Sequence, residues 1–467
     1  MKKTMKTLLF LCLSLILCVV FLTSCDESSG NGDATGNNEL AGNTTHTHTL
    51  GEWTVVKEPT EKETGLKEQK CTICGETVAT ENIPAIGSSG LSYILGEDGK
   101  TCTITGIGTC TDTDVVIPAF LEGYEVTAIE TRAFEKSGLT SVVIQDGVTY
   151  IGFCAFGSCY NLKSVVISDS VKVIDSQAFY ACPLTSVYYQ GTVEQWLGIS
   201  FGSNLGRGLP IDLYFNGELL TELVIPENVT SIRDRAFQSC GSLTSVVIPD
   251  SVTSIGNSAF SGCSKLTSVV IPESVTSIGD YAFNGCESLT SVVIPDGVTS
   301  IGESMFEECK SLTSVVIPDS VMSIGNYAFE NCESLTSIAI PDGVTSIGDS
   351  AFSDCIKLTS VVIPDSVTTI ADNAFKTCLK LTSVVIGNGV TSIGKGAFSE
   401  CVKLTSVVIG SSVTSIGNDA FRGFNNLSDV QYIGTKAAWE AIEKGSDYLF
   451  KTYVKEIVCS DGNVSLS

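Results

Sequence analysis

A repeat of 23 residues constrains the fold of this chain more strongly than any other feature of its sequence. One unit spans residues 266–288, and nine full units fill residues 220–426. Further units occupy 139–161 and 162–183. The nine units begin at Leu220, Leu243, Leu266, Leu289, Leu312, Leu335, Leu358, Leu381 and Leu404. A fixed period of this length predicts a solenoid, in which each unit buries its apolar face only against its neighbours.

The residue types within one unit predict its local structure. Residues 268–271 are Ser-Val-Val-Ile, which favours a strand in a parallel ladder, and Pro272 ends the pairing because it has no N–H to donate. A second short extended piece at 275–278 leads to Gly279, which permits a turn. We expect residues 282–286 to form a short helical or 3₁₀ turn.

Stacking the units turns each repeat position into a column. The leucine, the alternate strand residues, the alanine and the phenylalanine are expected to point inward, and the remaining strand positions outward. The outward positions form an uncharged row that is a candidate ligand face, because a long exposed apolar stripe marks an interaction surface. Flanking segments that cover the row, or a valine kept only for strand propensity, are the alternatives. The candidate residues are Ser268, Val270, Ser291, Val293, Ser314, Val316, Ser360 and Val362.

The pattern Leu266-x-x-Val269-x-Ile271 matches the strand of a leucine-rich repeat. The whole unit resembles the 23-residue repeats of the BspA-like family of bacterial and protist surface proteins, over residues 95–430. The resemblance implies a right-handed, parallel β-sheet-rich solenoid on the cell surface. It also implies a role in adhesion and in contact with host or bacterial cells.

Composition excludes several classes of function. The chain has 467 residues, with 52 acidic and 27 basic side chains and a formal net charge of −25, which argues against nucleic acid as a partner. His46 and His48 are its only histidines, so imidazole-centred catalysis in the body of the protein is excluded. No catalytic triad, phosphate loop or motif-placed carboxylate pair is present, and we therefore do not expect an enzyme.

Most of the 19 cysteines fall at one repeat position. Eight form a column in the nine units, and Cys159 and Cys182 take the same position upstream. Free cysteine behaves as a small buried hydrophobe, so we expect inert core thiols; a disulfide ladder and metal binding are the alternatives. The column in the nine units comprises Cys240, Cys263, Cys286, Cys309, Cys332, Cys355, Cys378 and Cys401.

A row of acidic residues follows the repeat prolines. A single row does not bring together the several oxygens that calcium needs, so we expect solvated turns instead. The row comprises Asp250, Glu273, Asp296, Asp319, Asp342 and Asp365.

The N-terminus has the features of an export signal. Residues 1–24 join a basic start to a short apolar stretch, and the sequence Leu22-Thr-Ser-Cys25 resembles a bacterial lipobox. This resemblance implies that Cys25 is lipidated and that the protein is extracytoplasmic, anchored to a membrane and exposed at the cell surface. An ordinary signal peptide with a chance cysteine is the alternative. The Ser/Gly/Asn/Asp-rich residues 25–45 are expected to form a flexible tether.

Residues 46–90 form a separate small module before the repeats. His46 and His48 precede the Cys71-x-x-Cys74 motif, and together they supply four candidate ligands for a structural zinc ion. A Cys71–Cys74 disulfide and free thiols remain open as alternatives. A unit this short with few apolar residues needs a staple to fold alone.

Two similar segments interrupt or end the repeats. Each carries a tryptophan, Trp196 or Trp439, that we expect to cover an open end of the solenoid, and an aromatic carbohydrate platform is the alternative. Thr192 and Gln195 predict a capping box at the start of a short helix. The chain thus divides into a first repeat block (91–219) with a cap-like insertion, a second block (220–429) and a C-terminal cap (430–467). Cys102 and Cys110 are candidates for a local disulfide.

Two functions fit these features. The favoured hypothesis is a surface-anchored protein that binds proteins or glycans of host or neighbouring cells over the repeat face. The alternative is a passive structural spacer of the bacterial envelope without a specific ligand.

Overall fold

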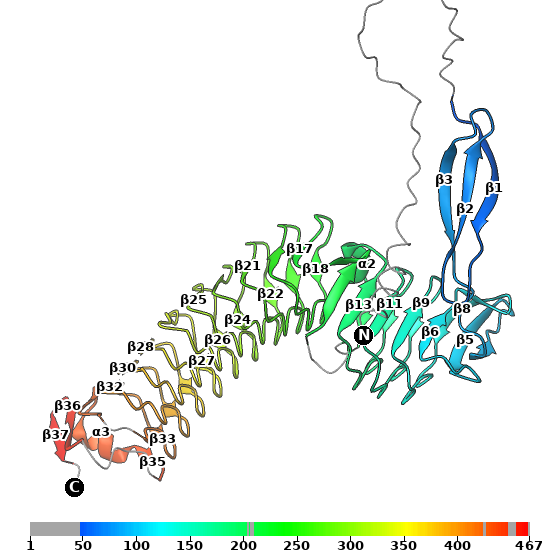
Figure 1. Cartoon of the computed structure of the whole chain (residues 1–467). Helices are drawn as coiled ribbons and strands as arrows, with labels where there is room; N and C mark the ends of the chain where they lie inside the picture. Colours follow the sequence, from blue (N-terminus) through cyan, green and yellow to red (C-terminus); the bar gives the residue numbers. More distant parts are fainter. Residues whose placement is uncertain (1–46, 203–204, 206–209, 424–425, 447–453, 466–467) are drawn as a thin grey trace, which may run out of the picture.

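A computed structural model of the chain describes residues 47–202, 205, 210–423, 426–446 and 454–465. The fold is a parallel β-solenoid of about 15 turns with very little helix, as the repeat predicted. Figure 1 shows a long curved solenoid, with a small three-stranded sheet that stands away from its N-terminal end. The predictions for Cys25, for His46 and for residues 1–45 lie outside the described residues.

One side of each coil contributes a front strand. These strands stack in parallel, and each residue pairs with the equivalent residue of the next repeat: Ser245 pairs with Ser268, and Ser291 pairs with Ser314. Those of the first block are β6 (Asp114–Ile117), β9 (Ser141–Ile144), β11 (Ser164–Ile167), β13 (Ser186–Tyr189) and β15 (Asp212–Phe215), with β16 (Glu218–Leu219) antiparallel at the end. Those of the second block are β17 (Glu222–Val224), β19 (Ser245–Val247), β21 (Ser268–Val270), β23 (Ser291–Val293), β25 (Ser314–Val316), β28 (Ser360–Ile363), β30 (Ser383–Ile386), β32 (Ser406–Ile409) and β34 (Asp429–Tyr432).

A second side contributes back strands, which are two residues long throughout the second block and confirm the second extended piece of the repeat. In the first block they are β4 (Ser92–Leu95), β5 (Thr101–Gly106), β7 (Phe120–Leu121), β8 (Tyr124–Ile129), β10 (Tyr150–Ile151), β12 (Val173–Ile174) and β14 (Ser200–Phe201). In the second block they are β18 (Ser231–Ile232), β20 (Ser254–Ile255), β22 (Ser277–Ile278), β24 (Ser300–Ile301), β26 (Ser323–Ile324), β27 (Ser346–Ile347), β29 (Thr369–Ile370), β31 (Ser392–Ile393), β33 (Ser415–Ile416) and β35 (Glu443–Lys444).

The core consists of the predicted inward columns. Leu266, Val275, Phe283 and Cys286 of one unit are all fully buried, and the same positions are buried along the second block. The phenylalanine rings from Phe237 to Phe421 form a continuous stack with centroids 5.1–5.7 Å apart and nearly parallel planes. Offset parallel rings at this spacing attract one another beyond the effect of burial alone.

The turn between the back and front strands differs from the expected helical or 3₁₀ turn. Its backbone N–H groups alternate between two partners: Phe283 N donates to Met305 O of the next coil, whereas Asn284 N donates to Tyr281 O within the turn. Tyr281 has a φ of 59°, in the left-handed region. A helix would direct every N–H within the segment, so the solenoid instead keeps a third hydrogen-bonded ladder between its coils.

The two blocks are joined by a packed junction. The helix α2 (Val193–Leu197) begins at the predicted Thr192–Gln195 capping box, which the structure confirms. Its Trp196 is buried against Tyr189, and the indole N–H donates to Ala236 O of the second block at 2.7 Å. Trp196 therefore does not cover an open end, and burial also excludes it as an exposed carbohydrate platform.

The C-terminal segment covers the last coil. The helix α3 (Lys436–Ala441) follows β34, and its Trp439 is buried against Tyr432. Strands β36 (Glu456–Cys459) and β37 (Gly462–Ser465) form an antiparallel hairpin at the end of the front sheet. Burial likewise excludes Trp439 as an exposed carbohydrate platform.

The N-terminal module is an antiparallel sheet of β1 (Leu50–Lys57), β2 (Gly65–Cys71) and β3 (Thr77–Ile83). The end of this sheet that contains the β1–β2 loop is attached to the solenoid, where Lys62 Nζ lies 3.2 Å from Asp112 Oδ2. The linker residue Ser88 is buried and exchanges hydrogen bonds with Val116 of β6. These contacts fix the end of the sheet that contains the β1–β2 loop.

Candidate ligand-binding face and metal cluster

The outward row of the front strands lies exposed over most of the second block. The valines are between 39% and 76% exposed, with Val270 the most exposed, and the serines Ser268, Ser291, Ser314 and Ser360 are exposed beside them. In the coil that lacks a front strand, Ala339 replaces the valine. The exposed valines are Val224, Val247, Val270, Val293, Val316, Val362 and Val385.

The hydroxyl of the threonine beside this row is hydrogen-bonded within the solenoid. Thr267 Oγ1 donates to Thr244 O at 3.1 Å, and Thr290 Oγ1 donates to Thr267 O at 3.3 Å in the next coil. The threonine hydroxyls therefore form a ladder that links successive coils. A partner on this face would meet mainly valine methyl groups and serine hydroxyls.

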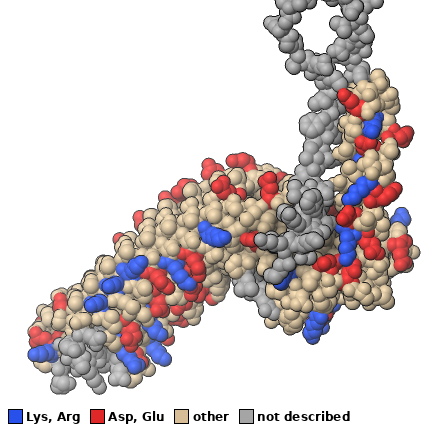
Figure 2. Space-filling model, in the orientation of Figure 1, with Lys and Arg blue, Asp and Glu red and all other residues tan. Residues whose placement is uncertain are grey.

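The acidic row lies along one edge of the face and is exposed. Its carboxylates serve the turns, as expected: Glu273 Oε2 accepts a hydrogen bond from Asp296 N at 3.2 Å, and Asp365 Oδ1 accepts one from Asn388 N. Figure 2 shows that uncharged surface predominates along the solenoid, with acidic side chains spread along its length.

A second polar row was missed in the sequence. The residue after the repeat glycine is usually Asp, Asn or Glu, and its side chain accepts the backbone N–H of the equivalent residue one coil later. Asn257 Oδ1 accepts from Asp280 N at 2.9 Å, and Asp280 Oδ1 accepts from Glu303 N at 2.9 Å. The recurrent Asp or Asn after glycine was the signal that could have revealed this ladder.

The cysteine column consists of buried thiols, as expected. All eight cysteines of the second block carry free thiols. Each thiol from Cys263 onward donates to the phenylalanine carbonyl of the preceding coil, as in Cys286 Sγ to Phe260 O at 3.3 Å. Burial raises the pKa of the Cys240 thiol to about 12, so it stays protonated and unreactive at neutral pH.

The expected disulfide between Cys102 and Cys110 is wrong. Both thiols are free, and Cys102 is buried in β5, where its Sγ faces Tyr124 O at 4.0 Å. Burial raises the pKa of the Cys102 thiol. The position of Cys102 in the core explains its presence without a covalent partner.

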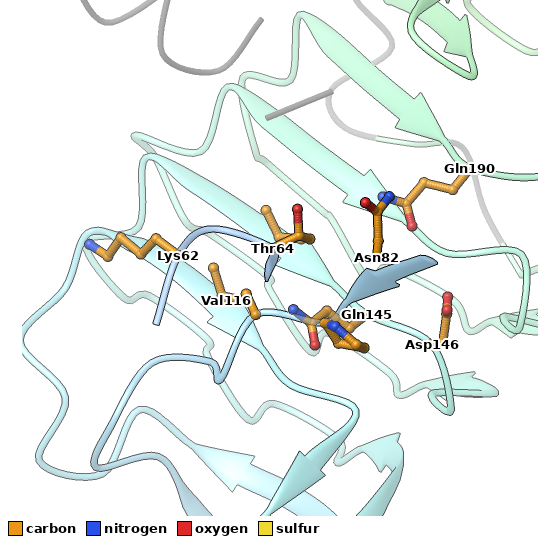
Figure 3. A pocket seen from close by; sticks show the side chains of 10 residues that line it. Lys62, Thr64, Asn82, Val116, Gln145, Asp146 and Gln190 are labelled. Atoms are coloured by element: carbon orange, nitrogen blue, oxygen red, sulfur yellow. The ribbon is translucent and has the colours of Figure 1, made fainter. Parts of the chain in front are cut away.

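A small cavity lies where the module meets the solenoid. It has a volume of about 110 Å³ and is lined by Lys62, Thr64 and Asn82 of the module and by Gln145 and Gln190 of the solenoid. Figure 3 shows the side chains of Asn82 and Gln190 close to one another, whereas Lys62 extends away from them. Burial, together with the charge of Asp169, raises the pKa of the Asp146 carboxyl at its rim. The cavity is too small for more than a few atoms, so we regard it as part of the junction between module and solenoid.

Three of the four predicted metal ligands converge at the far end of the module, which is the end with the β2–β3 turn, opposite the β1–β2 loop. Candidate ligand atoms of His48, Cys71 and Cys74 all lie within 4.8 Å of one another. His48 Nδ1 is 3.5 Å from Cys74 Sγ, and Glu76 Oε2 lies 3.7 Å from the same sulfur. His46, the fourth predicted ligand, lies outside the described residues. Glu76 was not identified from the sequence.

Solved bacterial proteins resemble this chain. A leucine-rich cell surface protein from Faecalibacterium prausnitzii is 30% identical, and the match covers 76% of this chain and 96% of that one, with a TM-score of 0.49. A leucine-rich repeat protein from Eubacterium ventriosum is 23% identical, with 81% and 98% covered and a TM-score of 0.50. One from Bacteroides ovatus is 26% identical, with 69% and 93% covered and a TM-score of 0.43.

No curated protein matches the chain. Within the described residues, no helix has the length and apolar character needed to cross a membrane.

The repeats match a family model directly. The model of the BspA-type leucine-rich repeat region matches residues 123–205, 212–336 and 322–437, which together make up more than half of the chain. The matched segments contain most of the front and back strands and the phenylalanine stack from Phe237 to Phe421. The chain therefore belongs to the family of BspA-type leucine-rich repeat proteins.

Proposed function

We propose that this protein is an extracytoplasmic, lipid-anchored surface protein that binds proteins or glycans of host or neighbouring cells. The binding site is the exposed Ser/Val row of the front strands in the second block. The observation that carries this proposal is the row of valines that are 39–76% exposed on seven coils of the second block, with the exposed Ala339 at the same position in the coil between Val316 and Val362. Single exposed apolar residues are ordinary, but a continuous apolar stripe marks an interaction surface.

The energetics favour an extended contact over a compact pocket. Complete burial of one exposed valine contributes about 1.5 kcal/mol, whereas association costs at least about 4 kcal/mol in lost freedom of motion. A partner must therefore cover valines of several coils at once, and the front strands present them at a regular spacing. Repeats of this kind support many weak contacts that act together.

The binding face is tested by introducing charge into it. A variant with Val293→Lys, Val316→Lys and Val362→Lys is expected to lose at least tenfold in binding to any partner identified on an array of extracellular-matrix proteins, mucins and glycans. The matched control carries Ser277→Lys, Ser300→Lys and Thr369→Lys, which are exposed on the back strands of the same solenoid. The control adds the same charge and should bind normally.

The outcome separates adhesion from a passive spacer. Equal binding by both variants would place the contact outside the front face. Absence of saturable binding to every array member, together with unchanged cell adhesion in a deletion strain, would favour the spacer.

The anchor is tested at Cys25. The variant Cys25→Ala is expected to carry no acyl chain, visible as loss of fatty-acid label from the purified protein, because the thiol that accepts the lipid is missing. Fatty-acid label retained by this variant would contradict lipidation at Cys25.

A further inference from the structure

The far end of the N-terminal module has the geometry of a metal site. His48 lies directly before β1, Cys71 ends β2, and Cys74 lies in the turn that leads to β3. Zinc bonds to sulfur at about 2.3 Å and to nitrogen at about 2.0 Å, so sulfur and nitrogen ligands of a tetrahedral site lie about 3.5 Å apart. Cys74 Sγ and His48 Nδ1 are separated by 3.5 Å.

The turn between Cys71 and Glu76 holds the two sulfurs in place. Gly75 N donates to Cys71 O at 2.9 Å, and Gly75 has a φ of 79°, which favours glycine. The backbone N–H of Ile73 points at Cys71 Sγ at 3.4 Å. An N–H directed at a sulfur stabilises the thiolate, which is the form that binds metal.

The module needs a cross-link at this end because its sheet has almost no core. Seven of the eight residues of β1 are exposed, among them Trp53 and Val55. A three-stranded sheet without a buried face is marginally stable in water. Its opposite end is attached to the solenoid through the Lys62–Asp112 ion pair, whereas the far end has no comparable anchor among the contacts that the structure describes.

We propose that His48, Cys71 and Cys74 bind a structural Zn²⁺ ion that ties together the far ends of β1, β2 and β3. Both sulfurs bind as thiolates and His48 binds through Nδ1, which leaves the fourth tetrahedral position to a water molecule. Glu76 is assigned as a positioning residue: its carboxylate lies 4.0 Å from His48 Nε2, beyond hydrogen-bond distance, and would act on the ring through its charge. The ion thereby replaces the hydrophobic core that the sheet lacks.

Metal content tests the site directly. The full chain, purified in detergent without chelator or reductant, is expected to contain one zinc ion per molecule. Cys74→Ser and His48→Ala should each lose most of this zinc, and both residues lie in the module, so the solenoid should still fold. Cys110→Ser, which changes a cysteine of the solenoid, should keep one zinc ion. A Cys71–Cys74 disulfide in the peptide mass spectrum, or unchanged zinc in Cys74→Ser, would overturn the proposal.

The role of Glu76 is tested by affinity. Glu76→Gln is expected to weaken zinc binding about tenfold or more in competition with a chelator, because second ligand-shell carboxylates have effects of this size. Glu76→Asp, which keeps the carboxylate, should stay closer to the wild type. Glu81→Gln, in β3 of the same module, is the control. Equal affinity of Glu76→Gln and Glu81→Gln would remove Glu76 from the site.

The structural role is tested by hydrogen exchange. Chelation of zinc should speed amide exchange in β1–β3 and leave β19–β32 protected, because only the module depends on the metal. In Cys74→Ser the module should exchange rapidly with or without chelator. Slow exchange in β1–β3 after complete removal of zinc would show that the sheet does not need it. These readouts are independent of partner binding by the front face.

Discussion

At the scale of single residues, the cysteine column shows how burial sets chemistry. Burial raises the thiol pKa above the ordinary value of 9.0 at seven positions, because a thiolate is poorly solvated in the core. The seven are Cys240, Cys263, Cys286, Cys309, Cys332, Cys355 and Cys378. These thiols act as small apolar side chains, and those from Cys263 onward also donate one hydrogen bond to the preceding coil.

The raised thiol pKa values predict that the protein loses stability in alkali. Below about pH 9 the thiols are protonated in the folded and in the unfolded chain, so they give the free energy of unfolding no pH dependence. Above about pH 9 the unfolded chain releases these protons and the folded chain keeps them, so each thiol lowers the free energy of unfolding by about 1.4 kcal/mol per pH unit. For Cys240 this decline ends near its folded pKa of about 12.

Thermal unfolding at a series of pH values measures this effect. The melting temperature should fall steeply above about pH 9, and a variant with Cys286→Ala, Cys309→Ala and Cys332→Ala should show a shallower fall despite its lower starting stability. An identical pH dependence in both proteins would contradict the role of the column.

Backbone strain at one repeat position gives a second prediction at this scale. Ser258 has a φ of 54°, and the equivalent residue in a later unit is Gly396, with a φ of 60°. A left-handed conformation costs a non-glycine residue about 1 kcal/mol. Ser258→Gly should therefore raise the free energy of unfolding by about 0.5 kcal/mol in urea titration, after the entropy that glycine adds to the unfolded chain. Ser268→Gly, in the extended strand β21, should lower it instead.

At the scale of elements, the phenylalanine stack is the continuous part of the core. Phe283 is fully buried between Phe260 and Phe306, with ring centroids 5.5 and 5.6 Å away. Phe283→Ala should lower the free energy of unfolding by about 3–5 kcal/mol, because it removes the contacts of the ring and leaves a cavity in the core.

Urea unfolding and regional hydrogen exchange measure the effect of Phe283→Ala. Faster exchange should centre on the coils next to Phe283, since each coil contacts only its neighbours. Val293→Ala, on the exposed front face, is the matched control and should change stability by less than about 0.5 kcal/mol. A uniform change along the solenoid would contradict local coupling.

The strands could be predicted from the sequence, whereas the turns could not. The alternation of residues 268–271 identifies both strand and buried side, because a strand directs successive side chains to opposite faces. The turn at Tyr281 depends on hydrogen bonds to the next coil, such as Tyr281 N to Glu303 O at 2.9 Å. No pattern within one unit reveals those partners.

At the scale of the whole molecule, the junction at Trp196 joins the two repeat blocks. The front strands of the two blocks belong to separate sheets, and the indole hydrogen bond to Ala236 O crosses between the blocks. Trp196→Phe removes this bond and part of the buried ring. It should separate the unfolding of residues 91–219 from that of the second block, visible as two transitions in exchange of the two regions.

The control for the junction is Trp439→Phe, which changes the equivalent tryptophan in the C-terminal segment. It should destabilise the last coils and leave the first block unchanged. A single shared transition in Trp196→Phe would mean that coupling between the blocks rests on other contacts, such as the bridge between Ile211 and Cys240.

The sequence alone determined the solenoid, its inward columns and its exposed face. Identical units stack at a constant offset, so each residue of a repeat meets its own equivalent and the environment of one unit predicts that of the next. The tertiary structure decided what does not repeat: that Trp196 lies inside the molecule, that Cys102 and Cys110 keep free thiols, and that Glu76 adjoins His48 and Cys74. Those contacts join segments of unlike sequence at unequal separations, and only the folded chain brings them together.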